Sequence, residues 1–488
     1  MLLVVANMPD SAKLQLLANL LPNEGIQWSE RSSPPLRLPG ALVLLGAATL
    51  LSTALGSFVV RFAPAFSVVS ALLAATIAVV ALRHDRLPGR HLLAGWAALT
   101  LVAQLASLLT GLHPVWIVAL GASAVLAVAT WVGAWRSRRP ARGRAGRVLR
   151  GGGVLVAAIA TALSVLLVSI AADPRPVATL LQSVGGSGNS FEPRRATETL
   201  ELNGSLVTND LEYGSTYPNS FLDVYIADGD PSVSRPTYVV VHGGGWIAGS
   251  KNDGDPNAPT GSAAYFALGA GPMLENGYNV VTLDYALAPE VPYPTPVIQL
   301  GEAMEFLERN GASYGLDMSR VILAGGSAGG QIVGQYAAIQ TDQDYSRETG
   351  IAQTLDAERL EAVVFDSAGL VPADLGRTEA PDLMNDWLFD LSGRTYFGTS
   401  RAVLDEADVI EHVTAGFPPS FLADGNTGTF PDQVTELADT LTKLGVENRT
   451  ELPPLEDAVL GHGYMAAESP STDRYNEHKL AFLASVLG

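Results

Sequence analysis

The chain has 488 residues, of which 48% are hydrophobic, and a mean hydropathy of +0.22, which is high for a soluble protein. It contains no cysteine, so disulfides, thiol catalysis and cysteine-ligated metals are excluded. The net charge of −19 is unevenly spread: residues 1–172 carry 14 Lys and Arg against 4 Asp and Glu, and the remainder carries 16 against 45. The two parts are therefore expected to lie in different surroundings.

Residues 1–38 show no clear pattern, but residues 39–172 have the composition of a membrane region. Five apolar runs without charged side chains are each about long enough to cross a bilayer, which takes ~20 residues per helix. These runs predict about five transmembrane helices, over 41–60, 65–82, 92–110, 115–135 and 153–171.

Arginine placement predicts the orientation of these helices. The loops at 82–91 and 136–150 carry three and seven arginines, whereas the loop at 111–114 carries none. Because cytoplasmic loops are enriched in Lys and Arg, both arginine-rich loops are expected inside the cell. Everything after residue 172 would then lie outside a multi-pass cell-membrane protein. The arginine run at 136–150 lies between two spans, which favours a topology signal over nucleic-acid binding.

Residues 173–200 contain the sequence Q-S-V-G-G-S-G-N-S, which predicts a flexible linker. Residues 201–488 are expected to form one α/β domain, because strand and helix patterns alternate from residue 221 onward. This alternation is typical of a mostly parallel sheet with helices on both faces. Strands are predicted at 221–227, 237–241, 279–283, 320–324, 360–365, 420–423 and 449–452, with helices at 262–277, 297–310, 327–340, 432–443 and 473–486.

A glycine run, His242-Gly243-Gly244-Gly245-Trp246, follows the strand predicted at 237–241. Acyl transfer develops negative charge on a carbonyl oxygen, which unobstructed N–H groups can stabilise. We expect the N–H groups of Gly244 and Gly245, together with that of Ala328, to form such an oxyanion hole. A plain glycine turn is the alternative, and neither fingerprint of a phosphate-binding loop is present. His242 itself is expected to orient the loop.

The apolar run at 321–324 ends in Gly325-Gly326-Ser327-Ala328-Gly329-Gly330. A buried strand that turns sharply into a helix at a glycine-flanked serine is the nucleophile elbow, so Ser327 is the expected nucleophile. Glycines are needed there because strand and helix pack too closely for side chains. Among the seven histidines, only His462 lies in a glycine-flanked loop close to the C-terminus, and it is the expected general base.

Together these motifs, with Asp284-Tyr285-Ala286-Leu287-Ala288-Pro289-Glu290 and Tyr293-Pro294-Thr295-Pro296, resemble the carboxylesterase and hormone-sensitive-lipase-like branch of the α/β-hydrolases, in particular its bacterial esterase-like members. The resemblance covers about residues 221–488 and implies an α/β-hydrolase fold with ester-hydrolysing activity. It does not extend to the membrane region.

The resemblance also implies a catalytic acid after the strand at 420–423, where family members have an aspartate in G-N-A-D-P-L. This chain instead has Gly425-Asn426-Thr427-Gly428-Thr429-Phe430, which puts Gly428 at the expected aspartate. Asp424 and Asp366 remain as about equal candidates, and Asp432 is a third. Asp432 could simply be a helix-start charge and Asp424 a turn residue, whereas Asp366 follows a strand at the edge of the sheet where ligands bind in α/β folds.

Residues 371–418 form an aromatic-rich insertion that is expected to cap the active site. The function that follows is a membrane-anchored serine esterase acting on small-molecule or lipid-like esters, with no metal or organic cofactor. The alternative is a catalytically impaired hydrolase-fold domain used for extracytoplasmic binding or sensing. Transport of a lipid by the spans is a third possibility, and the lack of charged residues within them argues against an ion pathway.

Overall fold

The computed structural model describes residues 38–58, 63–85, 87, 89–110, 113–136, 144–191, 199–202, 204–251, 271–380 and 382–488. The N-terminal segment before residue 38, the centre of the arginine-rich loop (137–143) and most of the helix predicted at 262–277 lie outside these residues.

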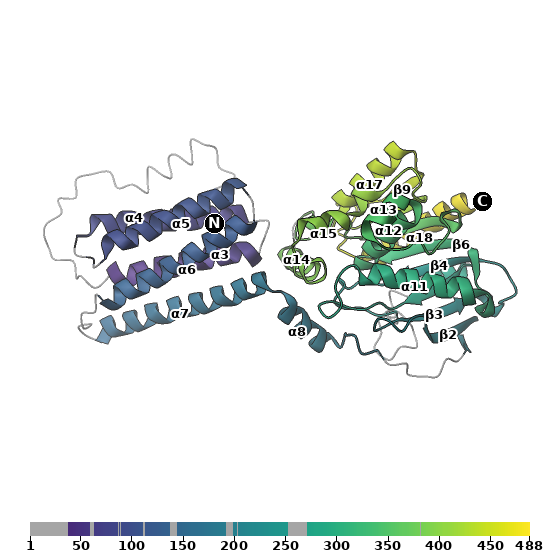
Figure 1. The fold of residues 1–488 in the computed structure, drawn as a ribbon, viewed down its shortest axis with the longest axis horizontal. Helices are drawn as coiled ribbons and strands as arrows, with labels where there is room; N and C mark the ends of the chain where they lie inside the picture. Colours follow the sequence, from purple (N-terminus) through teal and green to yellow (C-terminus); the bar gives the residue numbers. More distant parts are fainter. Residues whose placement is uncertain are drawn as a thin grey trace.

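The N-terminal part is a helical bundle next to a separate α/β domain (Figure 1). Within the bundle, α3 packs against α4, α6 and α7, and α5 packs against α4 and α6. The five helices are α3 (Leu38–Phe58), α4 (Ala63–Arg83), α5 (Arg90–Thr110), α6 (His113–Arg136) and α7 (Arg144–Ala172).

Among the described residues, three helices are long and apolar enough to span a membrane: Ala63–Arg83, Arg90–Thr110 and Val115–Ala134. The end of α7 and the following α8 (Arg175–Gly185) would make a fourth span if counted together, but they are bent by 91°. Gly40–Gly56 is a shorter apolar helix. The membrane region is thus supported by composition, and the number of five spans stays a prediction.

A buried polar cluster joins four helices of the bundle. The Gln104 amide of α5 donates to Thr53 Oγ1 of α3 at 2.8 Å and to Ser123 Oγ of α6 at 3.1 Å. Thr53 in turn donates to Ser70 Oγ of α4 at 3.0 Å. Neutral groups that hydrogen-bond one another can hold apolar helices together in a fixed register.

The predicted flexible linker is wrong over residues 175–189. Residues 175–185 form helix α8, whose Ala178 is fully buried in the core of the α/β domain. The Gln182 amide donates to the carbonyls of Ile247 and Ala288, and the Asn189 amide donates to that of Leu287. Gly/Ser composition alone predicted a tether, but these long-range contacts hold the segment on the domain.

The α/β domain contains a nine-stranded sheet in the order β1-β2-β3-β5-β4-β6-β7-β8-β9. Strands β1 to β3 are antiparallel and β3 pairs antiparallel with β5, whereas β5-β4-β6-β7-β8-β9 are all parallel. The strands are β1 (Thr199–Leu202), β2 (Ser205–Glu212), β3 (Phe221–Ile226), β4 (Pro236–Val241), β5 (Asn279–Leu283), β6 (Asp317–Gly326), β7 (Leu360–Asp366), β8 (Ser420–Ala423) and β9 (Asn448–Glu451).

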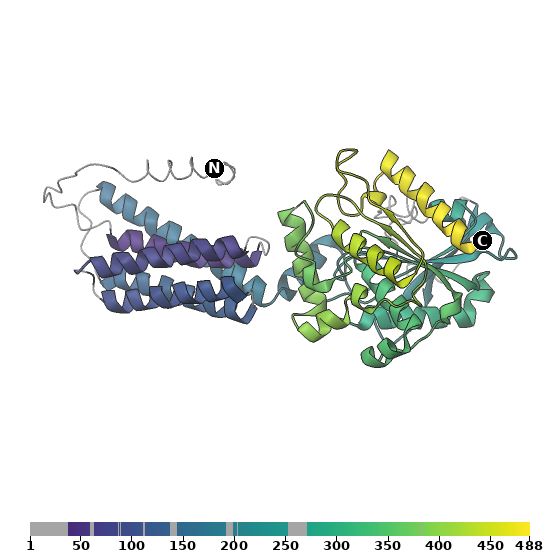
Figure 2. The same cartoon turned by 90° about the horizontal axis from the view of Figure 1, so that it is seen from above.

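Helices cover both faces of this sheet (Figure 2). They are α10 (Gly271–Glu275), α11 (Thr295–Asn310), α12 (Ala328–Thr341), α13 (Gln343–Thr349), α14 (Leu383–Phe397), α15 (Arg401–Glu406), α16 (Val409–His412), α17 (Pro431–Leu444) and α18 (Pro470–Leu487), with 3-10 turns η2 (Ala227–Gly229), η4 (Gly311–Tyr314), η5 (Ala357–Arg359), η6 (Pro372–Asp374) and η7 (Tyr464–Ala466). The predicted α/β-hydrolase fold is therefore confirmed. The prediction missed β1 and β2, which place β3 inside the sheet between β2 and β5.

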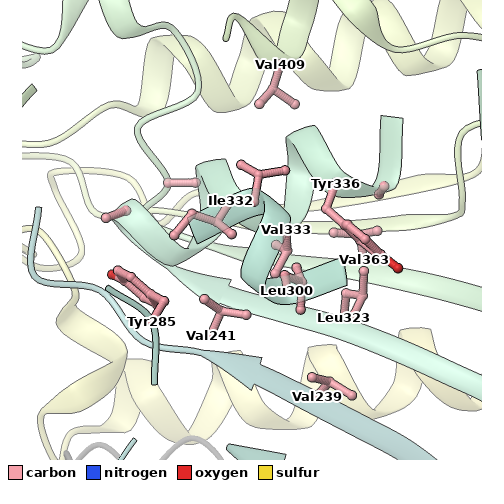
Figure 3. Close-up of a cluster of buried hydrophobic side chains, with 14 of the residues drawn as sticks. Val239, Val241, Tyr285, Leu300, Leu323, Ile332, Val333, Tyr336, Val363 and Val409 are labelled. Atoms are coloured by element: carbon pink, nitrogen blue, oxygen red, sulfur yellow. The ribbon is translucent and has the colours of Figure 1, made fainter. Parts of the chain in front are cut away.

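Alternate residues of the strands face two separate hydrophobic cores. On one face, Val239 and Val241 of β4 pack with Leu300 of α11 and Ile332 of α12 (Figure 3). On the other face, Val240 packs in the cluster that also contains Phe482 of α18. Parallel strands that are buried on both faces are held rigidly, so the loops at their carboxyl ends are fixed in position.

Candidate active site

Ser327 lies in a strained turn between β6 and α12. Its backbone has φ 52° and ψ −116°, a region that non-glycine residues rarely adopt. A Cβ on Gly325 would lie 2.2 Å from the carbonyl oxygen of Gly329, so the strand and helix meet without room for a side chain. The Ser327 N–H donates to the carbonyl of Asp366 at 2.8 Å, which ties the turn to β7.

The structure brings His462 to Ser327 from a distant part of the chain. His462 Nε2 lies 2.9 Å from Ser327 Oγ. The Phe389 ring of α14 packs against the imidazole, with 4.6 Å between ring centroids. Burial lowers the pKa of His462 to about 4, so the ring is neutral at pH 7 and can accept a proton.

The other nitrogen of His462 contacts a hydroxyl rather than a carboxylate. Thr429 Oγ1 lies 2.9 Å from His462 Nδ1 and donates to Asp424 Oδ1 at 2.6 Å. A hydroxyl has a single proton to donate. Because Thr429 gives it to Asp424, Thr429 must accept from Nδ1–H, which leaves Nε2 as the acceptor that faces Ser327.

Asp424 is a fully buried carboxylate at the end of β8. It also accepts backbone N–H groups of Gly425 and Phe430. Burial raises the pKa of Asp424 to about 6, opposed by hydrogen bonds from Ser367, Thr429 and the two backbone groups. Asp424 is thus mostly ionised at pH 7 and acts on His462 only through Thr429.

The other two acid candidates lie elsewhere. Asp366 lines the cavity, but its carboxylate accepts from the Tyr475 hydroxyl at 2.8 Å and faces the buried Lys479. Asp432 is exposed in the first turn of α17. Within the described residues, the His462 ring makes side-chain hydrogen bonds to Ser327 and Thr429.

Gly428, where the family has its aspartate, cannot readily carry a side chain here. Its φ is +62°, and an added Cβ would lie 2.9 Å from Asp382 Cβ and 3.0 Å from the Asn385 amide of α14. The Asn385 amide also donates to the Gly428 carbonyl at 2.9 Å. The space that a side chain at residue 428 would need is therefore occupied by the start of α14.

The glycine run lies next to Ser327, since a Cβ on Gly243 would be 3.2 Å from the Ser327 Cβ. Gly243 and Gly244 line a cavity of ≈ 250 Å³ together with Ser327 and His462. Gly244 has φ +99°, and a Cβ there would lie 2.2 Å from the Ala248 carbonyl oxygen, so only glycine allows this turn. Gly245 lies against Ser392 of α14, and Ala328 begins α12 directly after the serine.

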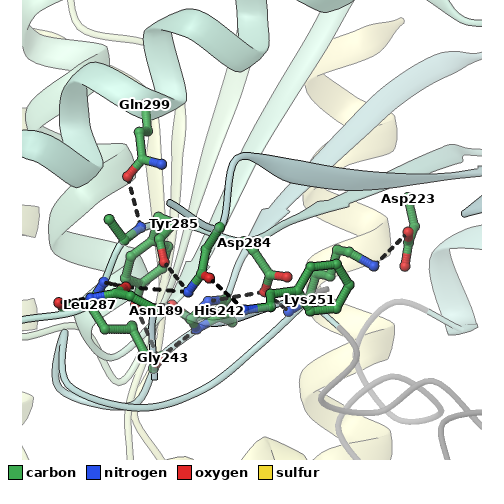
Figure 4. A network of polar contacts seen from close by, with 12 residues as sticks. Asn189, Asp223, His242, Gly243, Lys251, Asp284, Tyr285, Leu287 and Gln299 are labelled. Atoms are coloured by element: carbon green, nitrogen blue, oxygen red, sulfur yellow. Dashed lines mark hydrogen bonds and ion pairs between the residues drawn. The ribbon is translucent and has the colours of Figure 1, made fainter. Parts of the chain in front are cut away.

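A polar network fixes the start of this loop (Figure 4). His242 stacks on Tyr285 with 4.2 Å between ring centroids, and the Tyr285 hydroxyl donates to the carbonyl of Gly243 at 3.1 Å. Asp284 accepts the Lys251 N–H, and the buried Lys251 ammonium reaches Asp223 at 2.8 Å. His242 thus has the surroundings of a loop-orienting residue.

Sequence reasoning missed three contacts of the site: Thr429, Phe389 and Gly243. For Thr429 the only signal was the glycine at residue 428, where an aspartate was expected. That glycine put the identity of the acid in doubt but did not indicate which residue would contact His462. Phe389 was one of several aromatic residues in the insertion, and nothing in the pattern distinguished it from the others.

Comparisons with known proteins agree with this geometry. Residues 222–439 match the BD-FAE family. The chain is 30% identical over 240 residues to carboxylesterase NlhH of Mycobacterium tuberculosis, covering 47% of this chain and 66% of that protein. It is 23% identical over 268 residues to an esterase of Gibberella moniliformis, covering 54% of this chain and 79% of that one.

Among solved structures, the chain is similar to esterase B from Lactobacillus rhamnosis. The TM-score is 0.51 at 21% identity, covering 66% of this chain and 95% of that structure, which supports the fold. The chain spans slightly less than two thirds of the length of NlhH, and the family match at 222–439 lies outside the helical bundle. The C-terminal domain is thus similar to esterases in part of its sequence and in its α/β-hydrolase fold.

Proposed function

We propose that this chain is a membrane-anchored serine esterase whose catalytic domain, residues 201–488, lies outside the cytoplasm. The observation that carries the proposal is the 2.9 Å contact between Ser327 Oγ and His462 Nε2 at a strained elbow. The apolar helices of the bundle and the arginine-rich loops support the anchoring and the orientation.

In the proposed reaction, Ser327 Oγ attacks the ester carbonyl carbon while His462 Nε2 takes the hydroxyl proton of Ser327. The N–H groups of Gly244, Gly245 and Ala328 stabilise the negative charge on the carbonyl oxygen. His462 then gives the proton to the leaving alcohol, which leaves an acyl group on Ser327. Water activated by His462 attacks the acyl carbon, and the acid is released as Ser327 recovers its proton.

Thr429 and Asp424 act in this scheme as one unit. Thr429 holds Nδ1 as the protonated nitrogen, and its hydroxyl is polarised by the carboxylate behind it. The imidazolium that forms during attack is therefore stabilised by a dipole next to it and by a charge one hydrogen bond further away. Both effects favour charge separation in the buried site.

The test uses substitution of the two reacting side chains in the full chain. Ser327→Ala and His462→Ala should abolish hydrolysis of p-nitrophenyl butyrate, and a fluorophosphonate probe should label wild type but not Ser327→Ala. Ser232→Ala is the control, because Ser232 is exposed before β4, at the end of the sheet away from the cavity. Labelling of Ser327→Ala at the wild-type level would show that another residue is the nucleophile.

The hydroxyl between His462 and Asp424 also favours a second function, a hydrolase-fold domain that binds or senses an ester without turning it over. Ester hydrolysis and fluorophosphonate labelling of the wild type distinguish the two functions. A folded wild type that binds but never hydrolyses short esters, and that the fluorophosphonate does not label, would support the binding function.

A further inference from the structure

Exposed large apolar side chains of the α/β domain gather on three segments. Among the described residues after 172, all but Val233 lie on α8, on α14 or on the loop 453–461. We call this set the apolar face: Leu180, Leu181 and Val184 of α8, Leu383, Met384 and Leu388 of α14, and Leu455 and Val459 of the loop. Val184 is 80% exposed and Val459 is 73% exposed, so neither contributes to the packing of the domain.

Helix packing and hydrogen bonds connect the three segments. Helix α8 packs against α14. The Asn385 amide of α14 donates to the Gly428 carbonyl, and the Asn426 amide of the same turn donates to the carbonyls of Pro453 and Ala458. Helix α8 is therefore a neighbour of α14, and α14 is linked through the turn at 426–428 to the loop that leads into His462.

The same surface is attached to the end of the last apolar helix. The Arg394 guanidinium of α14 donates to the carbonyl of Ala171 in α7 at 2.7 Å. α7 and α8 meet at 91°, so a bilayer crossed by α7 has α8 lying along its surface. Helices α8 and α14 both lie on the side of the domain that faces the bundle (Figure 1).

Helix α8 has the residue distribution of a helix that lies at a membrane interface. Ala178 and Gln182 face the domain, where Ala178 is buried and Gln182 makes its two hydrogen bonds. Leu180 and Val184, four residues apart, are 60% and 80% exposed, whereas Leu181, three residues after Ala178, is only 38% exposed. A short helix with one apolar outer face gains free energy when that face enters the boundary between headgroups and acyl chains.

Helix α14 connects the apolar face to the catalytic groups. Phe389 of α14 packs on the His462 ring, and Ser392 of α14 lies next to Gly245. The cavity of ≈ 250 Å³ has room for the ester group and a short chain, so the rest of a long-chain ester must lie outside it. The exposed apolar surface that α14 joins to the catalytic groups is the apolar face.

We propose that the apolar face rests on the bilayer that the bundle crosses, and that the active site takes long-chain lipid esters from that membrane rather than esters from bulk water. The substrate part of this proposal rests on the proposed esterase function. The contact between face and bilayer does not, and it can be tested without activity.

The activity test compares two esters with the same leaving group. The full chain is reconstituted in phosphatidylcholine vesicles, and p-nitrophenyl palmitate within the vesicles is compared with p-nitrophenyl butyrate in water. In the double variant Leu180→Asp/Val184→Asp, charges replace two side chains of the face. We expect a loss of about tenfold or more on the palmitate and an unchanged rate on the butyrate, because lifting the face from the lipid leaves the catalytic groups in place.

The matched control is Val233→Asp, an exposed apolar residue before β4 at the opposite end of the sheet, which should change neither rate. Wild-type rates on both esters in the double variant would overturn the proposal. If wild type hydrolyses neither ester, the proposed esterase function fails, and the contact with the membrane is decided by the second measurement.

The second measurement uses the absence of cysteine from the chain. Val184→Cys and Val233→Cys each carry one spin label in the reconstituted full chain. The label at residue 184 should be accessible to oxygen and protected from a water-soluble nickel chelate, and the label at residue 233 should show the reverse. Equal exposure of both labels to the chelate would overturn the proposal, whatever the activity of the variants and even if one of them were inactive.

Discussion

Thr429 is the residue whose chemistry most distinguishes this site. A carboxylate beside Nδ1 of the base would offset the imidazolium charge directly, whereas a hydroxyl offers only a dipole. While Asp424 is ionised, it accepts the proton of the hydroxyl, so a lone pair of Thr429 faces Nδ1–H. The pair can therefore fix the tautomer fully while stabilising the charge less than a direct contact would.

Thr429→Val keeps the shape of the side chain and removes the hydroxyl. We expect kcat to fall by ~10² to ~10⁴, at most the loss seen when a triad acid is neutralised, with KM nearly unchanged. Thr429→Ser retains the hydroxyl and should stay close to wild type. Steady-state kinetics on a soluble short ester measure both. Equal activity of the Val and Ser variants would show that Thr429 only packs.

The rate of ester hydrolysis should fall in two steps as the pH is lowered. The pKa of Asp424 is raised to about 6, so below pH 6 the carboxyl becomes neutral and can donate to Thr429. Thr429 would then donate to Nδ1, and the ring would carry its proton on Nε2, which cannot accept one from Ser327. The second step is protonation of His462, whose pKa of about 4 places it lower.

The measurement is kcat/KM on a soluble ester between pH 4 and 9, for wild type and for Asp424→Asn. The variant lacks the titrating carboxyl, so its residual activity should show only the lower step. A fall near pH 6 that persists unchanged in Asp424→Asn would assign that step to another group.

At this scale the sequence predicted Ser327 and His462, because an elbow and a glycine-flanked histidine are local patterns. It left Asp424 and Asp366 open, since both end strands at the same edge of the sheet. Only the three-dimensional arrangement separates them: Asp366 is turned toward Tyr475 and Lys479, and Asp424 toward Thr429. A threonine with a catalytic partner looks like any other threonine in a sequence.

Among the elements, the connection from β4 to Lys251 carries the glycine run and depends on one buried cation. The Lys251 ammonium lies 2.7 Å from Asp210 and 2.8 Å from Asp223, and both Lys251 and Asp223 side chains are fully buried. Burial lowers the pKa of Lys251, but attraction to Asp223 and Asp284 and the hydrogen bonds to Asp210 and Asp223 outweigh it and raise the pKa. The lysine therefore neutralises acids that could not otherwise stay together.

Lys251→Met should destabilise the domain by about 3–5 kcal/mol, the range seen when one partner of a buried ion pair is removed. Denaturant unfolding followed by tryptophan fluorescence measures the loss. The double variant Lys251→Met/Asp223→Asn should recover part of the stability, because it removes a charge that the single variant leaves unpaired. No recovery would mean that Lys251 stabilises the domain through packing.

Sequence patterns located most of the parallel strands and the helices between them, since buried parallel strands are continuous apolar runs. They missed β1 and β2, whose mixed polar residues have no such signal. They also misassigned α8, because its stability comes from contacts with Ile247 and Ala288, which are far away in the sequence.

For the whole molecule, the placement of arginines in the loops between the apolar helices predicts that the α/β domain lies outside the cytoplasm. Protease added to intact cells that express the full chain, with the outer layers made permeable, should digest the α/β domain. Digestion only after the inner membrane is opened would place the domain in the cytoplasm and reverse the orientation of every span. A cytoplasmic protein of known location serves as the control for membrane integrity.

The docked α8 has a consequence for how such an enzyme would meet its substrate. A domain on a flexible tether samples a volume of solution, but Gln182, Asn189 and Arg394 hold this one against the end of α7. Its catalytic cavity therefore stays at a fixed distance from the membrane, and it would meet ester substrates as they diffuse laterally in the two dimensions of the bilayer. Turnover would then follow the mole fraction of ester in the lipid and fall when inert lipid is added, even if the total amount of ester in the sample stays the same.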